Sequence, residues 1–333
     1  MSIQSTAVIG AGGWGTALAI SWAKRGNSVT LWGNNPERAA RLRESRENAE
    51  YLPGAKLQDS IHVTSEIADC IAADLIVFVT PSVVLRSVAH RLSDAGLSSD
   101  SILLSGTKGI EHGSGLRMTE VIHEIFPENT VAVLSGPNLA VEVSRDLPTA
   151  AVLGCRNAQC AEELQTYLGS ERFRIYSSDE TIGIELGGAL KNVFAIAAGA
   201  SDGFGLGDNS KAALVTRSLA ELLRLGVAMG GNPRTFYGLS GAGDLIATCF
   251  SQLSRNRRVG ERLGRGETLE QISASTHMVA EGVPTAQSAY ECARKLQIET
   301  PIIDQIYSVL YEGKRPADAM QALLARDQKA ERG

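Results

Sequence analysis

The segment from residue 6 to residue 35 constrains the fold of this chain more than any other. A short apolar run at residues 7–9 passes directly into the sequence GAGGWG at residues 10–15, and an amphipathic segment and a second apolar run at residues 29–32 follow. This order is typical of a strand, a tight turn, a helix and a second strand. Gly10, Gly12 and Gly15 have the GxGxxG spacing, which permits a tight turn, close approach of a pyrophosphate to the backbone, and close packing of helix on strand.

The glycine spacing predicts a dinucleotide site. A helix that starts at Gly15 would direct its unpaired backbone N–H groups and the positive end of its dipole toward the phosphates. An ordinary tight turn between a strand and a helix is the alternative. The strand before the glycines, the helix after them and the second strand at the expected distance favour the dinucleotide site.

The residues after the second strand bear on which cofactor is bound. NAD-selective sites place an Asp or Glu there to bind the ribose 2′-OH, whereas this chain has the sequence GNNPER at residues 33–38. Asn34 or Asn35 could donate a hydrogen bond to either cofactor. Arg38 could pair with a 2′-phosphate or lie on a solvated helix face. We therefore expect NADPH, with NADH as the alternative.

Composition and charge exclude several classes of protein. The chain has 333 residues, 44% of them hydrophobic and 21% charged, which fits about two globular domains. A net charge of -5 argues against a general binder of nucleic acid or of anionic membranes. No apolar run approaches the ~20 residues of a membrane span, and the first strand begins too early for a signal peptide. Five scattered cysteines fit a reducing cytoplasm, and five unclustered histidines argue against a metal site.

Short apolar runs alternate with helical patterns as far as about residue 182, which predicts a doubly wound α/β sheet of the Rossmann type. The run LIVFV at residues 75–79 is continuous, as expected of a strand buried on both faces. Beyond residue 182 the periodicity is helical throughout. We therefore predict a dinucleotide-binding domain over residues 1–185 and an all-α substrate or catalytic domain over residues 186–333, with a helix continuing through residues 182–188.

Three loops with polar contents follow predicted strands. They are TPS at residues 80–82, SGTKG at residues 105–109 and SGPN at residues 135–138. Ligands of an open α/β sheet bind beyond the carboxyl ends of the strands. Lys108, between two glycines in the second loop, is therefore expected at the site rather than at a solvated loop tip.

Lys191 stands in an apolar stretch of the predicted second domain, beside Leu190, Val193 and Phe194. Burying a charge costs several kcal/mol, so this lysine either extends to solvent or has a function. Desolvation lowers a lysine pKa toward the operating pH, which suits a proton donor to an incipient alkoxide. Lys191 is therefore the candidate catalytic residue.

Two further motifs lie in the helical half. GLSGAGD at residues 238–244 is interpreted as a glycine-rich loop, and because no strand precedes it, it does not indicate a second nucleotide fold. Asp244 could orient a lysine, accept a hydrogen bond from a substrate hydroxyl, or cap a helix. SRNRR at residues 254–258 carries arginine forks that match a phosphate, and a solvated basic face is the alternative.

Nine motifs in order along nearly the whole chain resemble bacterial NAD(P)-dependent glycerol-3-phosphate dehydrogenase: GAGGWGTALA, LWGNNPE, FVTPS, SGTKGIE, SGPN, GALKNV, SGAGDL, SRNRR and VAEGVPTA. The resemblance implies reversible hydride transfer that reduces dihydroxyacetone phosphate to sn-glycerol 3-phosphate, the backbone of glycerophospholipids. It implies that Lys191 is the general acid and base at the C2 oxygen.

The resemblance also implies binding residues. Those for the substrate are Lys108, Gly136, Asn138, Lys191, Asp244, Ser254, Arg255 and Asn256, with Arg255 and Asn256 at the phosphate. Those for the cofactor, together with the fingerprint glycines Gly10, Gly12 and Gly15, are Gly13, Trp14, Asn34, Lys108, Ala140, Arg255, Val279 and Glu281. The chain departs from the commonest family residues at Gly13, where Ser is frequent, at Asn34, where His or Arg is frequent, and at Asn138, where Thr is frequent.

Two other functions compete with this interpretation. One is a dehydrogenase of the same architecture that acts on a β-hydroxyacid such as 6-phosphogluconate or ketopantoate. The other is a non-catalytic NAD(P)H-binding regulator, which would need the glycine fingerprint but not Lys108, Lys191 and Arg255 together. We expect a cytoplasmic homodimer with a small phosphorylated substrate, no nucleic-acid partner, no integral membrane segment and no metal.

Overall fold

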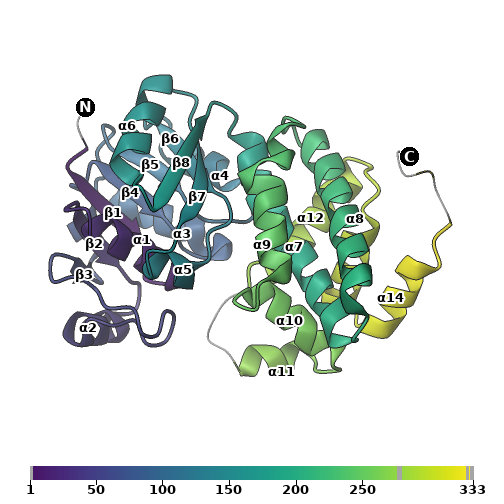
Figure 1. Ribbon diagram of the computed structural model, residues 1–333. Helices are drawn as coiled ribbons and strands as arrows, with labels where there is room; N and C mark the ends of the chain where they lie inside the picture. Colours follow the sequence, from purple (N-terminus) through teal and green to yellow (C-terminus); the bar gives the residue numbers. More distant parts are fainter. Residues whose placement is uncertain (1–2, 276–279, 328–329, 331–333) are drawn as a thin grey trace.

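The computed structural model describes residues 3–275, 280–327 and 330, and it has two parts (Figure 1). The first part contains one eight-stranded sheet. Its strands are β1 (Ser5–Ile9), β2 (Ser28–Trp32), β3 (His62–Thr64), β4 (Leu75–Phe78), β5 (Ile102–Ser105), β6 (Val131–Ser135), β7 (Thr149–Gly154) and β8 (Phe173–Ser178). The second part is helical, so the predicted fold class is confirmed.

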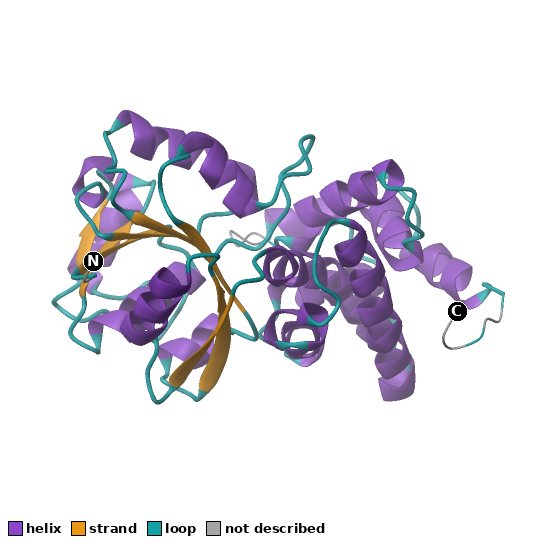
Figure 2. Cartoon of the chain, turned by 90° about the horizontal axis from the view of Figure 1, so that it is seen from above, coloured by secondary structure: helices purple, strands orange, loops and turns teal. Residues whose placement is uncertain are grey.

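The strand order is β3-β2-β1-β4-β5-β6-β7-β8, and the first six strands are parallel. This is the Rossmann order, and its direction reverses between β1 and β4, where ligands of such sheets bind. Every residue of β4 is buried, because helices cover both faces of the sheet there. Figure 2 shows helices on both sides of the twisted sheet.

β7 runs antiparallel to β6, and β8 runs parallel to β7. The sheet is therefore antiparallel at this one junction, a detail that the prediction of a doubly wound sheet left open. A parallel connection needs a crossover, usually a helix that packs back across the sheet. The connection between β6 and β7 contains only the five-residue α5 (Ala140–Ser144), which packs against α1.

Five longer helices flank the sheet: α1 (Gly13–Ala23), α2 (Pro36–Ser45), α3 (Leu85–Asp94), α4 (Met118–Ile125) and α6 (Ala158–Leu168). α1 begins at Gly13, two residues before the predicted start at Gly15. Nearly all of its residues are buried, because α1 is wedged between the sheet and α5. Because α1 begins within the glycine turn, the unpaired N–H groups of its first turn lie at that turn.

The second part is built around α7 (Ile182–Gly203), and the predicted helix through residues 182–188 is confirmed. By length and composition α7 could cross a membrane, but 94% of its most apolar window is buried inside the protein. It is therefore the core helix of this part. Around it lie α8 (Gly207–Ala228), α9 (Asp244–Phe250), α10 (Arg255–Gly264), α11 (Leu269–Ala274), α12 (Gly282–Lys295), α13 (Pro301–Tyr311) and α14 (Pro316–Leu324).

α7 and α10 cross with their backbones in direct contact. A Cβ atom on Gly199 of α7 would lie 1.8 Å from the carbonyl oxygen of Arg257, and a Cβ atom on Gly260 of α10 would lie 1.8 Å from the carbonyl oxygen of Ile196. Gly203 and Gly264 repeat this contact one turn further along each helix. The crossing fixes the amino end of α10 relative to α7.

The predicted division between residues 185 and 186 would fall inside α7. Glu185 is buried there, and its carboxylate accepts hydrogen bonds from the Arg117 guanidinium at 2.7 Å and from the backbone N–H of Thr119 at 2.9 Å. Burial raises the pKa of Glu185, and the charge of Arg117 opposes that shift. This ion pair ties α7 to the start of α4, and the exact domain boundary stays a prediction.

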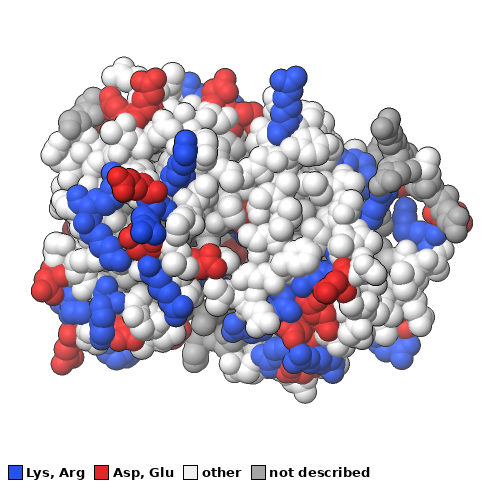
Figure 3. Space-filling view, viewed as in Figure 1, with Lys and Arg blue, Asp and Glu red and all other residues white. Residues whose placement is uncertain are grey.

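Charged side chains of both signs are mixed on the face of the molecule shown in Figure 3. All five cysteines are free, and four of them are buried. Within residues 3–275, 280–327 and 330, no group of three or more His, Cys, Asp or Glu residues could hold a metal ion. The expectations of no nucleic-acid partner and no metal stay predictions.

Candidate active site

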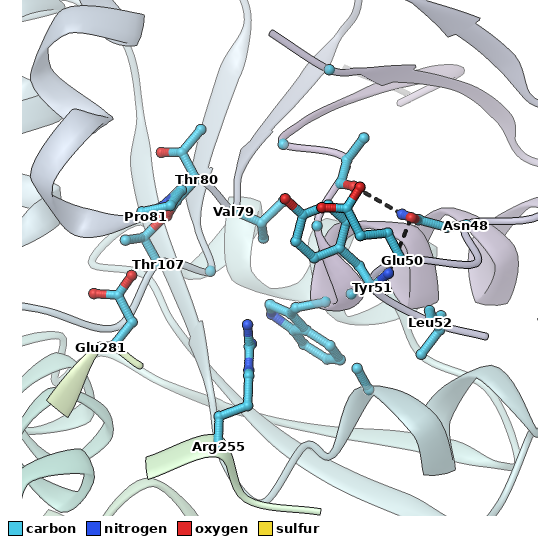
Figure 4. A pocket seen from close by; sticks show the side chains of 18 of the residues that line it. Asn48, Glu50, Tyr51, Leu52, Val79, Thr80, Pro81, Thr107, Arg255 and Glu281 are labelled. Atoms are coloured by element: carbon cyan, nitrogen blue, oxygen red, sulfur yellow. Dashed lines mark hydrogen bonds between the residues drawn. The ribbon is translucent and has the colours of Figure 1, made fainter. Parts of the chain in front are cut away.

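A cleft of about 1200 Å³ lies between the carboxyl ends of the central strands and the helical part. Its walls are the glycine turn, the loops after β4 and β5, the segment at residues 44–53, α7 and the amino end of α10. Figure 4 shows Arg255 extending into this cavity, with Glu281 and Pro81 on one side and Tyr51 on the other. The cleft thus joins both parts of the chain at the reversal point of the sheet.

The glycine turn has the shape of a dinucleotide cradle. Gly10 has φ +130°, and a Cβ atom on it would lie 2.8 Å from the carbonyl oxygen of Val79. A Cβ atom on Gly12 would meet nothing within 4 Å, because open space adjoins the backbone there. The indole N–H of Trp14 is buried without a hydrogen-bond partner among the described residues. An open space at the amino end of α1 is the environment that binds a pyrophosphate.

The segment at residues 44–53 covers the glycine turn. The side-chain amide of Asn48 donates hydrogen bonds to the carbonyl oxygen of Ala11 at 2.9 Å and to the hydroxyl of Thr16 at 2.7 Å. A Cβ atom on Gly13 would lie 2.8 Å from the carbonyl oxygen of Tyr51. A serine at position 13 would therefore require this segment to shift. Sequence reasoning missed Asn48, since nothing in its neighbourhood marks a contact 37 residues away.

Two lysines share one buried carboxylate at the floor of the cleft. The Lys191 ammonium donates hydrogen bonds to Asp244 Oδ1 at 2.8 Å and to the Thr248 hydroxyl at 2.6 Å. The Lys108 ammonium donates to Asp244 Oδ2 at 2.6 Å and to the carbonyl oxygen of Gly136 at 2.9 Å. The Asp244 side chain is 2% exposed. Two ammonium groups on one carboxylate leave an excess positive charge where water has little access.

Burial lowers the pKa of Lys191 to about 8. The Asp244 carboxylate opposes this shift, while the positive charge of Lys108 adds to it. A lysine in this environment can hold or release a proton near neutral pH, which a solvated lysine cannot do. The position of its Nζ atom is fixed by Asp244 and Thr248, so the proton is held at a defined point.

The amino end of α10 faces the same cleft. Ser254 is its N-cap, and its hydroxyl accepts a hydrogen bond from the backbone N–H of Arg257 at 3.2 Å. The Arg255 side chain is exposed to the space of the cleft, and the cleft walls surround it. Desolvation by these walls lowers the pKa of Arg255, and the charge of Glu281 opposes that shift. It remains a cation. Asn256 is held at 2.8 Å by Asn192 and by the backbone N–H of Gly282.

Glu281 joins the two parts of the chain across the cleft. Its carboxylate accepts hydrogen bonds from the Ser82 hydroxyl at 2.6 Å and from the Ser82 backbone N–H at 3.2 Å. Burial raises the pKa of Glu281, and both Ser82 bonds oppose this shift. The loop after β4 is therefore linked to the start of α12.

Both halves of the chain match one protein family. Residues 5–161 match the N-terminus of NAD-dependent glycerol-3-phosphate dehydrogenase, and residues 180–321 match its C-terminus. A relative from Syntrophotalea carbinolica, named glycerol-3-phosphate dehydrogenase (NAD(P)+), is 48% identical over 328 residues, covering 97% of this chain and 98% of that protein. The chain belongs to the NAD-dependent glycerol-3-phosphate dehydrogenase family.

Other members of the family agree in sequence and in structure. A relative of the same name from Desulfitobacterium hafniense is 46% identical over 325 residues, covering 98% of this chain and 92% of that protein. The crystal structure of a glycerol-3-phosphate dehydrogenase from Coxiella burnetii superposes with a TM-score of 0.94 at 36% identity, covering 97% of this chain and 99% of that one. The resemblance predicted from the sequence is therefore confirmed.

The structure gathers most of the residues predicted for the family site in one cleft. Those that line it are Gly10, Gly12, Gly13, Trp14, Asn34, Lys108, Asn138, Ala140, Lys191, Ser254, Arg255, Asn256 and Glu281. Gly136 and Asp244 stand behind Lys108 and hold its ammonium. Gly15 packs beneath Gly10, since a Cβ atom on Gly15 would lie 2.0 Å from the Gly10 carbonyl oxygen. Val279 lies outside the described residues.

The interpretation of residues 238–244 as a loop was wrong. They form a π-helical turn, Leu239–Gly243, that leads directly into α9. A Cβ atom on Gly241 would lie 2.0 Å from the carbonyl oxygen of Phe236, so this glycine permits a compact turn rather than an open one. Asp244 is consequently the first residue of α9, with Thr248 one turn later on the same face. Sequence reasoning missed Thr248 because it did not recognise this helix.

The basic run at residues 254–258 is only partly solvated, since Arg255 and Arg258 are exposed and its other members are not. Asn256 and Arg257 are buried. The Arg257 guanidinium pairs with Asp202 at 2.6 Å and with Glu261 at 3.1 Å, away from the cleft. Of this run, Ser254, Arg255, Asn256 and Arg258 line the cleft. The roles of these side chains in binding stay predictions.

Proposed function

We propose that this chain catalyses the reversible NAD(P)H-dependent reduction of dihydroxyacetone phosphate to sn-glycerol 3-phosphate, the backbone of glycerophospholipids. The observation that carries the proposal is the Lys191–Asp244–Lys108 cluster, which lies in one cleft with the glycine turn and with the amino end of α10. Membership of the family supports it. The cleft accordingly has a place for a dinucleotide, for a proton donor and for a phosphate.

The dinucleotide site belongs to the glycine turn. The open space beside Gly12 at the amino end of α1 fits a bound pyrophosphate. When bound, NAD(P)H supplies the hydride for the reduction. Ala140, Arg255 and Glu281 complete the walls around this space.

Lys191 holds the proton that the product hydroxyl receives. Reduction of the ketone places negative charge on the C2 oxygen, and an ammonium beside that oxygen both stabilises the charge and donates the proton. Asp244 and Thr248 keep the Nζ atom in place. Lys108 shares the Asp244 carboxylate, and its positive charge lowers the pKa of Lys191 further.

The amino end of α10 anchors the substrate phosphate. Unpaired N–H groups at the start of a helix attract an anion, and Arg255 adds a guanidinium fork at the same place. Holding the remote phosphate converts binding energy into correct orientation of the carbonyl group.

The pH dependence should differ between the two directions of the reaction. Reduction needs Lys191 as an ammonium, so its kcat/KM should fall as the pH rises through about 8. Oxidation of glycerol 3-phosphate needs the neutral amine, so its kcat/KM should rise over the same interval. Initial rates in both directions between pH 6 and about 10 test this. Parallel profiles in the two directions would contradict the acid–base role of Lys191.

Arg255→Ala should raise the KM for dihydroxyacetone phosphate by about 10- to 100-fold, because a hydrogen bond to a charged group contributes about 1.5–3 kcal/mol. Cofactor affinity should fall less, since Arg255 is one of several residues around the dinucleotide. Arg265→Ala is the control: this residue follows α10, and its side chain is 63% exposed and pairs with Glu261. Unchanged substrate kinetics in Arg255→Ala would rule out the anchor.

The proposed function is tested by absorbance of the nicotinamide band. Purified protein is mixed with dihydroxyacetone phosphate and either NADPH or NADH, and reverse reactions use glycerol 3-phosphate, 6-phosphogluconate and the product of ketopantoate reduction. We expect oxidation of the reduced cofactor with dihydroxyacetone phosphate, and reverse turnover with glycerol 3-phosphate alone. Turnover only with one of the two acids would reject the proposed substrate, and cofactor binding without any turnover would favour a regulator.

We propose in addition that the protein is a cytoplasmic homodimer. Closed two-fold symmetry is the commonest arrangement of soluble enzymes, and five free cysteines fit a reducing compartment. Light scattering coupled to gel filtration gives the mass in solution, to be compared with 35.3 kDa for one chain. Cell fractionation tests the location.

A further inference from the structure

The carboxyl end of β2 is the place where a Rossmann sheet distinguishes NADH from NADPH. The adenosine ribose lies there, and its 2′ substituent is either a hydroxyl, bound by an acid, or a phosphate, bound by a nearby arginine. In this chain β2 ends at Trp32, and Gly33 and Asn34 follow it into the cleft. With Asn34 in place of an acid, no carboxylate directly after the strand repels a phosphate.

Arg91 reaches this point from a different element. It stands in the last turn of α3, and its Nη1 atom donates a hydrogen bond to Asn34 Oδ1 at 2.5 Å. Its guanidinium also lies over the Trp32 ring, 5.0 Å from the centroid. Arg91, Asn34 and Trp32 all line the cleft.

Trp32 is a rigid support for the Arg91 guanidinium. Its side chain is buried, and its indole N–H donates a hydrogen bond to the carbonyl oxygen of Ser65 at 2.9 Å. A guanidinium stacked on a fixed aromatic ring is held in one plane by a cation–π contact. Because Asn34 orients the same group from the side, the Arg91 fork is ordered before any ligand binds.

The charge of Arg91 is not neutralised, whereas that of Arg38 is. Arg38 pairs with the Glu50 carboxylate at 2.8 Å, donates to the Tyr51 hydroxyl at 2.8 Å, and lies over the Tyr51 ring. Within residues 3–275, 280–327 and 330, no carboxylate forms an ion pair with Arg91. The sequence left Arg38 either as a partner of a 2′-phosphate or as a residue of a solvated helix face, whereas in the structure its guanidinium is bound to Glu50 and Tyr51.

We infer that Arg91 is the specificity-determining residue that binds the 2′-phosphate of NADPH, with Asn34 as its positioning residue. The inference rests on the proposed function and extends it to the choice of cofactor. The ligand group is a phosphomonoester dianion on the ribose, which a planar arginine fork matches with two N–H donors. Asn34 accepts from Arg91 through its carbonyl oxygen, so its amide N–H groups are available to the same phosphate.

The test is a set of binding measurements, without turnover. Titration calorimetry or nicotinamide fluorescence gives the Kd of NADPH and NADH for wild type and Arg91→Ala. We expect Arg91→Ala to weaken NADPH by about 10- to 100-fold and NADH by less than about threefold. The affinity for 2′,5′-ADP should fall with that for NADPH, and the affinity for 5′-AMP should not. Added salt should reduce the preference of the wild type for NADPH.

Three variants separate this role from a structural one. Arg38→Ala and Arg41→Ala remove cations that also border the cleft, and both should keep most of the preference for NADPH. Asn34→Asp introduces the acid of NAD-selective sites and should weaken NADPH while NADH is retained.

Equal weakening of NADPH and NADH in Arg91→Ala would show that Arg91 only supports Trp32, and would overturn the inference. A selective loss of NADPH in Arg41→Ala instead of Arg91→Ala would overturn it as well. A wild-type protein that binds neither cofactor would reject the proposed function, and the inference with it. Wild-type binding of both cofactors with no change in Arg91→Ala would reject the inference alone.

Discussion

Lys191→Ala should lower kcat by about 10²- to 10⁴-fold in both directions, the range that a positioned acid or base contributes. The variant loses the ammonium that would donate to the C2 oxygen in reduction and the amine that would accept the proton in oxidation. Binding of NADPH should change by less than about threefold, because Lys191 stands at the floor of the cleft and not at the glycine turn. Steady-state rates and calorimetric titration of the cofactor give the two quantities.

The fold should tolerate this change. After loss of Lys191, the buried Asp244 carboxylate still has the Lys108 ammonium at 2.6 Å, so no uncompensated charge remains. The residual activity of Lys191→Ala should also lose the dependence on a group with a pKa of about 8. A general loss of structure would lower the rate without removing that dependence.

Lys211→Ala is a matched control for the catalytic lysine. The Lys211 side chain is 6% exposed, against 9% for Lys191, and it pairs with Asp202 at 2.8 Å. It does not line the cleft. This variant should be less stable than wild type but should keep its kcat within about threefold. Equal losses of kcat in both variants would mean that Lys191 matters for burial of charge and not for proton transfer.

The sheet could be predicted from the sequence because each strand carries its own signal. The glycine turn, the apolar runs and the helical stretches between them are local patterns, and the strands predicted at residues 7–9, 29–32 and 75–79 agree with β1, β2 and β4 within two residues. The antiparallel direction of β7 could not be predicted in this way. It depends on α5 docking against α1, which is a contact between segments more than 100 residues apart.

In the candidate site, too, features that depend on neighbouring residues could be predicted, and contacts between distant segments could not. Lys108 was predicted from its place after a strand, and Lys191 from its apolar neighbours, since both features are local. That both lysines share Asp244 could not be predicted, because this pairing spans 136 residues for Lys108 and 53 for Lys191. The family resemblance singled out Arg255, but nothing in the local sequence pattern distinguishes it from Arg257. Only the packing of α10 on α7 directs Arg255 into the cleft and Arg257 toward Asp202.

Gly260→Ala should destabilise the protein by about 3 kcal/mol or more, at the upper end of the usual cost of overpacking. A Cβ atom at this position would lie 1.8 Å from the Ile196 carbonyl oxygen and 2.9 Å from the backbone nitrogen of Ala200. Both atoms belong to the backbone of α7, so no side chain can rotate to make room, and α10 must move. Thermal unfolding followed by circular dichroism measures the loss, with the exposed Arg265→Ala as the control.

The same variant should affect the site, because α7 carries Lys191 and α10 carries Arg255 and Asn256. A shift of α10 away from α7 separates the phosphate anchor from the proton donor and breaks the hydrogen bond between Asn256 and Asn192. Folded Gly260→Ala, assayed well below its unfolding temperature, should therefore show a higher KM for dihydroxyacetone phosphate as well as a lower kcat. Gly264→Ala, with a closest approach of 2.5 Å, should show a smaller version of both effects. Wild-type stability in Gly260→Ala would contradict a backbone contact between the helices, and lost stability with unchanged KM would mean that α10 keeps its position without it.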